Sequence, residues 1–515
     1  MANSQHTGVG GGVVFIIYDK RRNGTKKELV TLIGRETAAL SARADMFDSN
    51  PAAQLTGPLS ISVPGEINGY YAAWEEFGRL PWATLFEPVI KMCEEGWTVT
   101  SSMGISIKKA EKTIRNDKYL KEAYVKGDDT LYKEGDKMTN PKMARTFKAI
   151  AEGGPKAFYF GDLAKDIVAD IQDAGGNLTM EDFAANKAVW EDALTVVLNN
   201  GNYSVHAAPP PSSGVVVQFI LKVMDGYNLQ AGSFNTTEQK TLLLHRLIET
   251  WKFAFARRPQ LSDVQFTTDT EVHWLNKLQN TTYAEYIRRK VKDDGVSPLQ
   301  FYLPDQDDNT TRQDTGGTSH LSVLALDGAA VSVTSTVGSL FGCKIIGNRT
   351  GIVFNNMMDL FTLPAKGNIS ANHIAPGKRG RSSVSPIMVR DRDGRVALLA
   401  GGAGSKRIIT ATSFVAVQNL WMGVDIADAL NHARVHYQLR PDVVYYDKQM
   451  PKDILDGLKR KGHTKFTLTH VKYPYLAVVE AIDAKTCLKC RPTDSFTSCI
   501  HAASDYRKSG VPDGY

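Results

Sequence analysis

DTGGTSHLSVLALDGAAVSVTSTVGSLF, residues 314–341, contains two strand-like segments separated by a turn. The first segment is apolar throughout at 324–326, which predicts a strand buried on both faces. Asp327-Gly328 then gives a strong short-range signal for a hairpin turn. Beyond the turn, Val331 and Val333 alternate with polar residues, as in a half-buried strand. The stretch therefore predicts an antiparallel β-hairpin.

Thr318 stands at the start of the first strand, directly behind Gly316 and Gly317. Thr318 is a nucleophile-type residue, and a cut at these flexible glycines would expose it with a free α-amine. The same residues also fit a Gly-rich loop that enters an ordinary hairpin. On this stretch alone, the ordinary hairpin is the favoured interpretation.

The composition is that of a soluble globular protein with one large or two to three ordinary domains. The chain has 515 residues, of which 42% are hydrophobic and 23% charged. Its net charge is only +6, and the basic clusters at 20–22, 288–290 and 459–461 are scattered and mostly lack interleaved aromatic residues. This pattern favours solvated surface charge over a nucleic-acid site. No apolar run approaches the roughly 18 residues of a membrane span.

Asparagine sequons favour an extracellular or luminal glycoprotein. Met1 leads almost directly into a strand-like segment, GVGGGVVFIIYD, without a signal-like sequence. One sequon would carry little information, but eight occur and favour glycosylation. They lie at Asn23, Asn177, Asn202, Asn235, Asn280, Asn309, Asn348 and Asn368. We therefore expect a secreted or cell-surface protein whose signal or anchor, if any, lies upstream of this sequence.

The candidate metal ligands do not form a convincing metal-binding pattern. Cys487, Cys490 and Cys499 lack a second ligand pair, so a disulfide or free thiols are favoured over zinc. His245 and Glu249 are four residues apart on a predicted helix, but no second histidine is near them in the sequence. A solvated or structural pair is therefore the expected role, and no metal site is predicted.

Strands and helices alternate on both sides of the hairpin, which predicts α and β layers in one globule. Strand pairs are expected at 10–34 and 189–209, helices at 63–97 and 160–176, and a strand at 395–405. Residues 297–315 are expected to form a polar linker that ends at the Gly-Gly-Thr sequence, and 501–515 to be loop-like.

A series of motifs resembles the γ-glutamyltranspeptidase, or glutathione hydrolase, family from about residue 7 to 515. The motifs are GGTSHLSV, VSVTST, TGIVFNN, GKRGRSS, HAASDYRKSG, HRLIETWKFAFARR, FGRLPWATLFEPVI and APPPSSG. The resemblance implies the α+β fold of N-terminal-nucleophile hydrolases, a four-layer αββα sandwich. Its chemistry implies no cofactor. Members normally carry a further N-terminal stretch, so this chain resembles the family from partway through its fold.

The resemblance implies that the precursor cuts itself between Gly317 and Thr318. Residues 1–317 would form a large subunit and 318–515 a small catalytic subunit, together one globular domain. Thr318 would be both nucleophile and, through its freed amine, internal base. Thr336 would hydrogen-bond the Thr318 hydroxyl and orient it.

The resemblance also assigns the groups that hold the substrate. The backbone N–H groups of Gly404 and Ser405 would stabilise the oxyanion, although the family has glycine at both positions. Arg35 would hold the substrate α-carboxylate together with Ser382 and Ser383. From the residues alone, Arg35 is better interpreted as a surface ion-pair residue.

Three positions depart from the family pattern. Where the family grips the glutamyl α-ammonium with Asn, Glu and Asp, this chain has Gly338, Met357 and Leu360. A buried ammonium without partners costs several kcal/mol. Asp359 is one residue away, but a shift of one residue turns a side chain to another face. A tyrosine that the family often places near the nucleophile is Leu340 here.

Two functions follow from these residues. The first is an extracellular γ-glutamyl hydrolase or transferase, which would pass the acyl group of glutathione or a related amide to water or to an amino-acid or peptide acceptor. The second is a secreted family member with lost or altered γ-glutamyl activity, which serves as a binding or interaction protein or as an acylase with altered specificity.

Overall fold

The computed structural model describes residues 3–22, 27–303, 316–364, 370–469, 476–485, 500–508 and 510–514, apart from the side chain of residue 200. The sequons at Asn23, Asn309 and Asn368 lie outside these residues, as does most of the predicted linker. The three C-terminal cysteines, Cys487, Cys490 and Cys499, lie outside them as well. Within the described ranges, no helix has both the length and the apolar character needed to cross a membrane.

The first sheet has five antiparallel strands in the order β5-β2-β1-β9-β8. They are β5 (Val189–Glu191), β2 (Leu29–Gly34), β1 (Gly12–Tyr18), β9 (Ala330–Ser339) and β8 (Gly316–Leu324). The predicted hairpin is β8–β9, with Gly328 at a φ of 84° in the turn. The two strands expected at 10–34 are β1 and β2, so both predictions are confirmed.

The second sheet has six strands in the order β16-β15-β11-β10-β7-β6. They are β16 (His501–Ser504), β15 (Val478–Asp483), β11 (Val396–Ala403), β10 (Ile387–Asp391), β7 (Tyr203–Ala207) and β6 (Leu194–Leu198). The strand expected at 395–405 is confirmed as β11. The loop expected at 501–515 is wrong at its start, because β16 pairs with β15. Residues 189–209 form three strands rather than a pair, because the chain passes from the first sheet at β5 to the second at β6.

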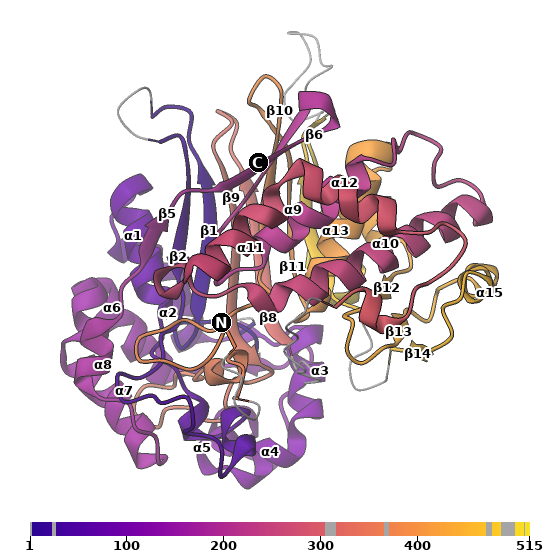
Figure 1. The fold of residues 1–515 in the computed structure, drawn as a ribbon. Coiled ribbons are helices and arrows are strands. Elements are labelled where there is room, and N and C mark those ends of the chain that lie inside the picture. The colour runs from indigo at the N-terminus through magenta and orange to yellow at the C-terminus, as the bar shows by residue number, and fades with distance from the viewer. Residues whose placement is uncertain are drawn as a thin grey trace.

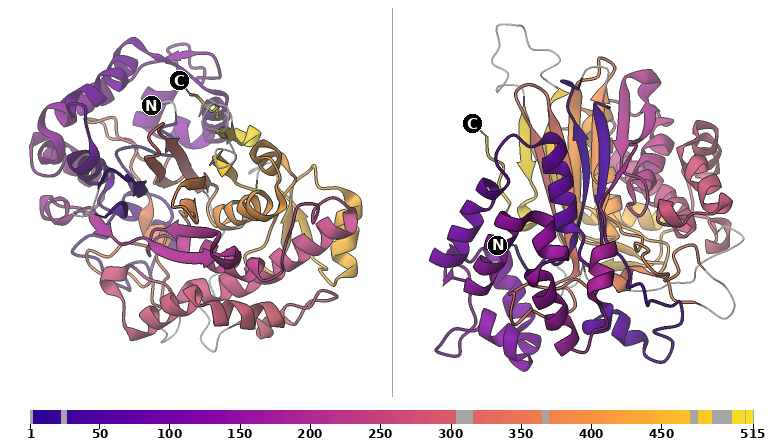
Figure 2. Two further views of the ribbon diagram at one scale, coloured as in Figure 1. Left: turned by 90° about the horizontal axis from the view of Figure 1, so that it is seen from above. Right: turned by 90° about the vertical axis from the view of Figure 1, so that its left-hand side faces the viewer.

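Helices cover the outer face of each sheet (Figures 1 and 2). On the first sheet lies α1 (Glu66–Phe77), with α2 (Glu87–Glu95) and α6 (Pro141–Tyr159) beside it. On the second lie α9 (Gly214–Asp225) and α13 (Arg407–Met422), with α10 (Thr237–Arg257) packed on α9. The elements therefore stack in the order helix, sheet, sheet, helix. Two of the helices, α1 and α2, are the pieces expected within 63–97.

The remaining elements are short or peripheral. The helices are α3 (Ser101–Lys109), α4 (Glu111–Asn116), α5 (Lys118–Tyr124), α7 (Asp162–Asp173), α8 (Met180–Ala185), α11 (Asp269–Gln279), α12 (Thr281–Lys290), α14 (Ile426–Asn431) and α15 (Lys452–Arg460). The strands are β3 (Trp97–Thr98), β4 (Lys137–Met138), β12 (Val435–His436), β13 (Val444–Tyr446) and β14 (Phe466–Leu468). The helix expected at 160–176 is α7.

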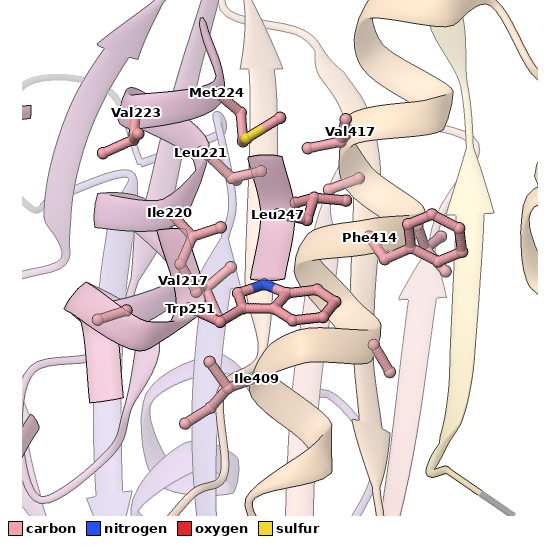
Figure 3. Packing of buried hydrophobic residues seen from close by; sticks show 14 of the residues in the cluster. Val217, Ile220, Leu221, Val223, Met224, Leu247, Trp251, Ile409, Phe414 and Val417 are labelled. Atoms are coloured by element: carbon pink, nitrogen blue, oxygen red, sulfur yellow. The ribbon is translucent and has the colours of Figure 1, made fainter. Parts of the chain in front are cut away.

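The largest apolar core joins α9, α10 and α13 to the second sheet. Trp251 of α10 lies between Val217 of α9 and Ile409 of α13 (Figure 3), and it is fully buried. Its indole N–H donates to the Oγ of Ser413 at 3.2 Å. A capping box at Thr236 begins α10. This packing fixes the helical layer against which β11 and its neighbours are held.

The expectation that the first hairpin strand is buried on both faces is wrong. β8 is the edge strand of its sheet, and Leu321 and Val323 are 59% and 46% exposed. The alternate residues face the second sheet, where the ring of His320 hydrogen-bonds the hydroxyls of Thr334 and Ser322. Burial lowers the pKa of His320 to about 3, so the imidazole is neutral. The run of apolar residues therefore gave the wrong prediction, because β8 is an edge strand with one face exposed to solvent.

Glu66 is a buried acid between α1 and β9. Its carboxyl accepts hydrogen bonds from Ser335 Oγ at 2.9 Å and from Tyr70. Burial raises the pKa of Glu66 from about 4.5 to about 8, although both hydrogen bonds oppose the shift. Since the folded pKa is the higher one, the folded state holds a proton that the unfolded state releases between pH 4.5 and 8. Folding stability is therefore lost as pH rises through that range.

Glu66→Gln should remove this dependence, because glutamine keeps the shape without the titration. We expect the melting temperature of the variant, relative to the wild type, to rise steadily from pH 5 to pH 8. Differential scanning fluorimetry at fixed ionic strength measures it. A constant difference across that range would contradict the shifted pKa.

Candidate functional site

Thr318, Thr336 and the carbonyl of Gly317 form a chain of hydrogen bonds across the β8–β9 pair. Thr318 Oγ1 donates to Thr336 Oγ1 at 3.2 Å, and Thr336 Oγ1 donates to the Gly317 oxygen at 2.5 Å. The N–H of Gly338 also donates to Thr336 Oγ1, at 2.9 Å. The Thr336 hydroxyl thus accepts two hydrogen bonds and donates one. Both threonines are buried. The arrangement orients the Thr318 hydroxyl and polarises the carbonyl of the peptide bond directly before it.

The strand register shifts between Gly317 and Thr318, as in a β-bulge. A Cβ on Gly317 would lie 2.6 Å from the backbone oxygen of Ser339, so only glycine fits there. A Cβ on Gly316 would lie 2.6 Å from the Ser405 nitrogen. The peptide bond that the resemblance marks for cleavage is thus held in an irregular, tightly packed backbone.

Gly404 and Ser405 follow β11 and lie against this bulge. Both have positive φ, 131° and 63° respectively. A Cβ on Gly404 would lie 2.7 Å from Cα of Ala477, so that position requires glycine. Ser405 occupies a left-handed conformation that glycine adopts more readily. Their role as oxyanion donors stays a prediction.

A cavity of about 100 Å³ opens beside Thr318. Its lining includes both predicted serines, Ser382 and Ser383, and the residues that depart from the family pattern, Gly338, Met357 and Leu360. The hairpin and the loops that follow β9 and precede β10 meet at this point. The structure therefore brings the predicted nucleophile and most of the predicted substrate-binding residues to one place.

Arg35 lies behind that cavity and does not belong to its lining. It is fully buried and forms an ion pair with Glu36 at 2.9 Å, so the surface position favoured from the residues alone is wrong. Its Nη2 donates to the Sδ of Met357 at 3.2 Å, and Met357 does line the cavity. Burial raises the pKa of Glu36 to about 6 although Arg35 opposes the shift. The predicted carboxylate clamp is thus separated from the cavity by one methionine side chain.

An asparagine, the residue of the family pattern, does not fit at position 338 without rearrangement of its neighbours. The φ of Gly338 is 94°, and a Cβ there would lie 2.1 Å from Oδ1 of Asn356. That oxygen already accepts the N–H of Ser339 at 2.8 Å. The neighbouring departure, Leu340, packs against a separate apolar cluster and does not line the cavity.

Lys508 and Arg258 also reach the site, and we did not predict either from the sequence. Lys508 Nζ donates to the carbonyl oxygen of Thr318 at 2.8 Å. Burial lowers the pKa of Lys508 to about 8, against the opposing charge of Glu480. Arg258 lines the cavity, and its Nη2 donates to Ser383 Oγ at 3.0 Å. Lys508 and Arg258 both belong to motifs that carry the family resemblance, and this was the signal in the sequence that could have identified them.

The family described as "Gamma-glutamyltranspeptidase" matches residues 1–515. The chain belongs to the γ-glutamyltranspeptidase family. Among similar curated proteins is "Scoloptoxin SSD14" of Scolopendra dehaani, 35% identical over 90% of this chain and 79% of the relative. "Glutathione hydrolase 3" of Arabidopsis thaliana is 34% identical over 87% of this chain and 68% of the relative. "Glutathione hydrolase 5 proenzyme" of Rattus norvegicus is 32% identical over 100% and 86%.

Solved structures show the same fold. Cephalosporin acylase from Bacillus halodurans superposes with a TM-score of 0.82 at 21% identity, over 100% of this chain and 89% of that one. γ-Glutamyltranspeptidase from Helicobacter pylori matches with a TM-score of 0.51 at 28% identity, over 56% of this chain and 81% of that one. The mixed α+β architecture of this family member is accordingly that of N-terminal-nucleophile hydrolases.

The pair at His245 and Glu249 is buried rather than solvated, and the fold supplies a second histidine. His463 Nε2 lies 2.9 Å from His245 Nδ1, and ligand-type atoms of the three residues lie within 4.8 Å of one another. Lys252 Nζ, however, is 2.7 Å from Glu249 Oε1. An ammonium therefore already balances the carboxylate, and the group is a structural hydrogen-bonded network.

A larger cavity of about 740 Å³ lies on the opposite side of the hairpin, beneath α1, α2 and α6. Its lining is mainly apolar and aromatic, including Trp74, Trp82 and Phe147, and its strand floor includes Ser319 and Ser335. Because side chains alternate along a strand, Ser319 and Ser335 face this cavity while Thr318 and Thr336 face the smaller one. The larger cavity does not reach the hydroxyl of Thr318.

Ser405→Gly should stabilise the protein by about 1 kcal/mol, the difference between left-handed strain on serine and the greater chain entropy of glycine. The matched control is Ser405→Ala, which keeps a Cβ and should give no gain. Thermal melts of the three proteins measure the effect. A glycine variant that melts below the wild type would contradict the strain assigned to Ser405.

Proposed function

We propose that this chain is a self-processing γ-glutamyl hydrolase or acyltransferase with Thr318 as its nucleophile. The observation that carries the proposal is the hydrogen-bonded set of Thr318, Thr336 and the Gly317 carbonyl. Glutathione and related γ-glutamyl amides are the proposed substrates, because similar curated proteins are named glutathione hydrolases. Water or an amino-acid or peptide amine is the proposed acceptor.

In the proposed first reaction, the chain cuts itself between Gly317 and Thr318. The Thr336 hydroxyl polarises the Gly317 carbonyl, and Thr318 Oγ1 attacks its carbon as the peptide C–N bond breaks. The nitrogen takes the proton that the hydroxyl loses, and water then hydrolyses the ester. The products are residues 1–317 with a new carboxylate and residues 318–515 with a free α-amine.

In the proposed second reaction, that α-amine takes the proton from Thr318 Oγ1 as the oxygen attacks the substrate amide. The N–H groups of Gly404 and Ser405 are the proposed donors to the tetrahedral oxyanion. The close approach of Gly316 to the Ser405 nitrogen supports this sequence of events, since movement of the new chain end at Gly317 away from Thr318 would uncover that N–H. Departure of the substrate's amine leaves an acyl ester on Thr318. Water or the acceptor amine then takes the acyl group from the threonine.

A second candidate function is a secreted family member with lost or altered γ-glutamyl turnover, serving as a binding or interaction protein. Gly338, Met357 and Leu360 favour it, because none offers a side-chain acceptor for the substrate ammonium and all three line the cavity. A secreted or cell-surface location is also proposed. The five sequons within the described residues support it, because all are exposed: Asn177, Asn202, Asn235, Asn280 and Asn348.

A denaturing gel followed over time tests the first reaction. The wild type should convert from one band to two, and Thr318→Ala should stay uncut. Thr336→Val should slow the cut by roughly ten- to a hundredfold, the effect of one lost buried hydrogen bond. Thr334→Val on the same strand is the control, because its hydroxyl contacts His320 instead. A wild-type chain that never cuts would exclude the proposed nucleophile.

Release of 4-nitroaniline from a γ-glutamyl anilide by the cut protein tests the second reaction. Turnover that disappears in Thr318→Ala supports the hydrolase or transferase. A protein that cuts itself fully but releases no product from any acyl anilide would instead support the binding or interaction function.

Lys508→Met should slow self-cleavage by about tenfold or more, because the carbonyl of Thr318 loses a charge-assisted hydrogen bond. Lys508→Arg, which keeps a charged donor, should recover part of the rate. The exposed Lys452→Met serves as the control. Equal cleavage rates in the methionine variant and the wild type would show that Lys508 has no positioning role.

A further inference from the structure

We propose that the cavity beside Thr318 selects an acyl group that ends in a carboxylate and carries no ammonium group. The class of donor is the monoamide of a five-carbon dicarboxylic acid, a glutaryl amide, in preference to a γ-glutamyl amide. The proposal rests on the proposed function in taking Thr318 as the nucleophile. It concerns which acyl group the same cavity accepts.

The charges that line the cavity favour an anion. Arg258, Arg381 and Lys406 are in the lining, and Asp359 is the one acidic side chain among the lining residues that the structure describes. A substrate ammonium would therefore enter a region with an excess of positive charge. A carboxylate would be attracted to it, and the low polarisability of a partly buried site strengthens both effects.

Ser383 provides a donor that is aimed by Arg258. The Oγ of Ser383 accepts a hydrogen bond from Arg258 Nη2 at 3.0 Å, so its own proton is available for a carboxylate oxygen. Arg258 Nε donates to Ser213 Oγ at 3.0 Å, and Ser213 Oγ donates to the carbonyl of Ser382 at 2.6 Å. All four residues are buried. This network fixes both serines and places the positive charge of Arg258 beside Ser383.

Part of the lining is apolar and offers an ammonium no acceptor. Met357, Leu360 and Phe361 contribute to it. Behind Met357 lies the guanidinium of Arg35, 3.2 Å from the sulfur. An ammonium placed against Met357 would lose water and gain no acceptor from that side chain, whose sulfur already accepts the Arg35 N–H. A methylene at the same place loses nothing.

The reaction itself does not require the ammonium. Thr318 Oγ1 attacks the amide carbon, the C–N bond breaks, and the departing amine takes the proton held by the α-amine of Thr318. Water then attacks the ester, which releases the dicarboxylic acid and returns the proton to Oγ1. Every bond that changes lies at the far end of the acyl chain from the α-carbon, so a hydrogen in place of the amino group leaves the chemistry intact.

Three matched 4-nitroanilides measure the preference in the cut wild-type protein: glutaryl, γ-L-glutamyl and pentanoyl. They share a five-carbon acyl chain and differ in the carboxylate and the amino group. We expect kcat/KM for the glutaryl compound to exceed both others by about tenfold or more, equal to about 1.4 kcal/mol. A γ-glutamyl value equal to or above the glutaryl value would overturn the exclusion of the ammonium. A pentanoyl value equal to the glutaryl value would overturn carboxylate recognition.

Calorimetric binding of glutarate, L-glutamate and pentanoate separates this proposal from the proposed function. The wild type and Thr318→Ala are both titrated, because binding of these three acids can be measured without turnover. Tighter binding of glutarate than of the other two without turnover would reject the enzyme and keep the cavity preference. Turnover without any preference for glutarate would reject the cavity preference and keep the enzyme.

Arg258→Gln should abolish the preference of glutarate over pentanoate, whereas Arg258→Lys should keep part of it. Arg257→Gln is the control, because Arg257 donates to Tyr283 and to the Tyr302 carbonyl instead. Met357→Glu should shift binding from glutarate toward L-glutamate, since it adds an acceptor to the apolar wall. An Arg258→Gln protein that is folded by its thermal melt and still prefers glutarate would contradict the role of Arg258. If that variant does not fold, the ratio in Arg258→Lys decides.

Discussion

The hydrogen bond from Thr336 to the carbonyl of Gly317 is the contact on which the site depends. It joins the two strands of the hairpin at the point where their register shifts, and it needs glycine at 317 because Ser339 leaves no room for a Cβ. Lys508 reaches the carbonyl of Thr318 from the C-terminal segment. Contacts from two parts of the chain therefore hold the backbone on both sides of one peptide bond, and the Thr336 hydroxyl polarises its carbonyl.

The nucleophile and the acyl-donor cavity can vary independently because different segments build them. Backbone geometry and two threonine hydroxyls define the position of Thr318. Side chains from the segments around Met357, Ser383 and Arg258 define the cavity. Met357, Ser383 and Arg258 take no part in the hydrogen bonds among Thr318, Thr336 and Gly317. A family member can thus keep the cleavage geometry while the group it accepts changes.

The hairpin, the first strands and the main helices were predictable because their signals are local. A turn at Asp327-Gly328, a capping box at Thr236 and apolar runs specify them within a few residues. The exposure of Leu321 on the edge strand β8 could not be predicted, because the burial of a strand depends on which strands lie beside it in the sheet. Lys508, Arg258 and His463 were missed for the same reason. Each acts on a residue more than a hundred positions away, and no spacing in the sequence encodes that contact.

N-terminal sequencing of the smaller chain in the purified, cut protein tests whether Thr318 is generated as a nucleophile. The hydrogen-bond geometry predicts that this chain begins Thr-Ser-His-Leu and that its mass and that of the larger chain sum to the precursor plus one water. A chain that begins at any other residue, or a protein that remains uncut while it turns over an acyl anilide, would contradict the assignment.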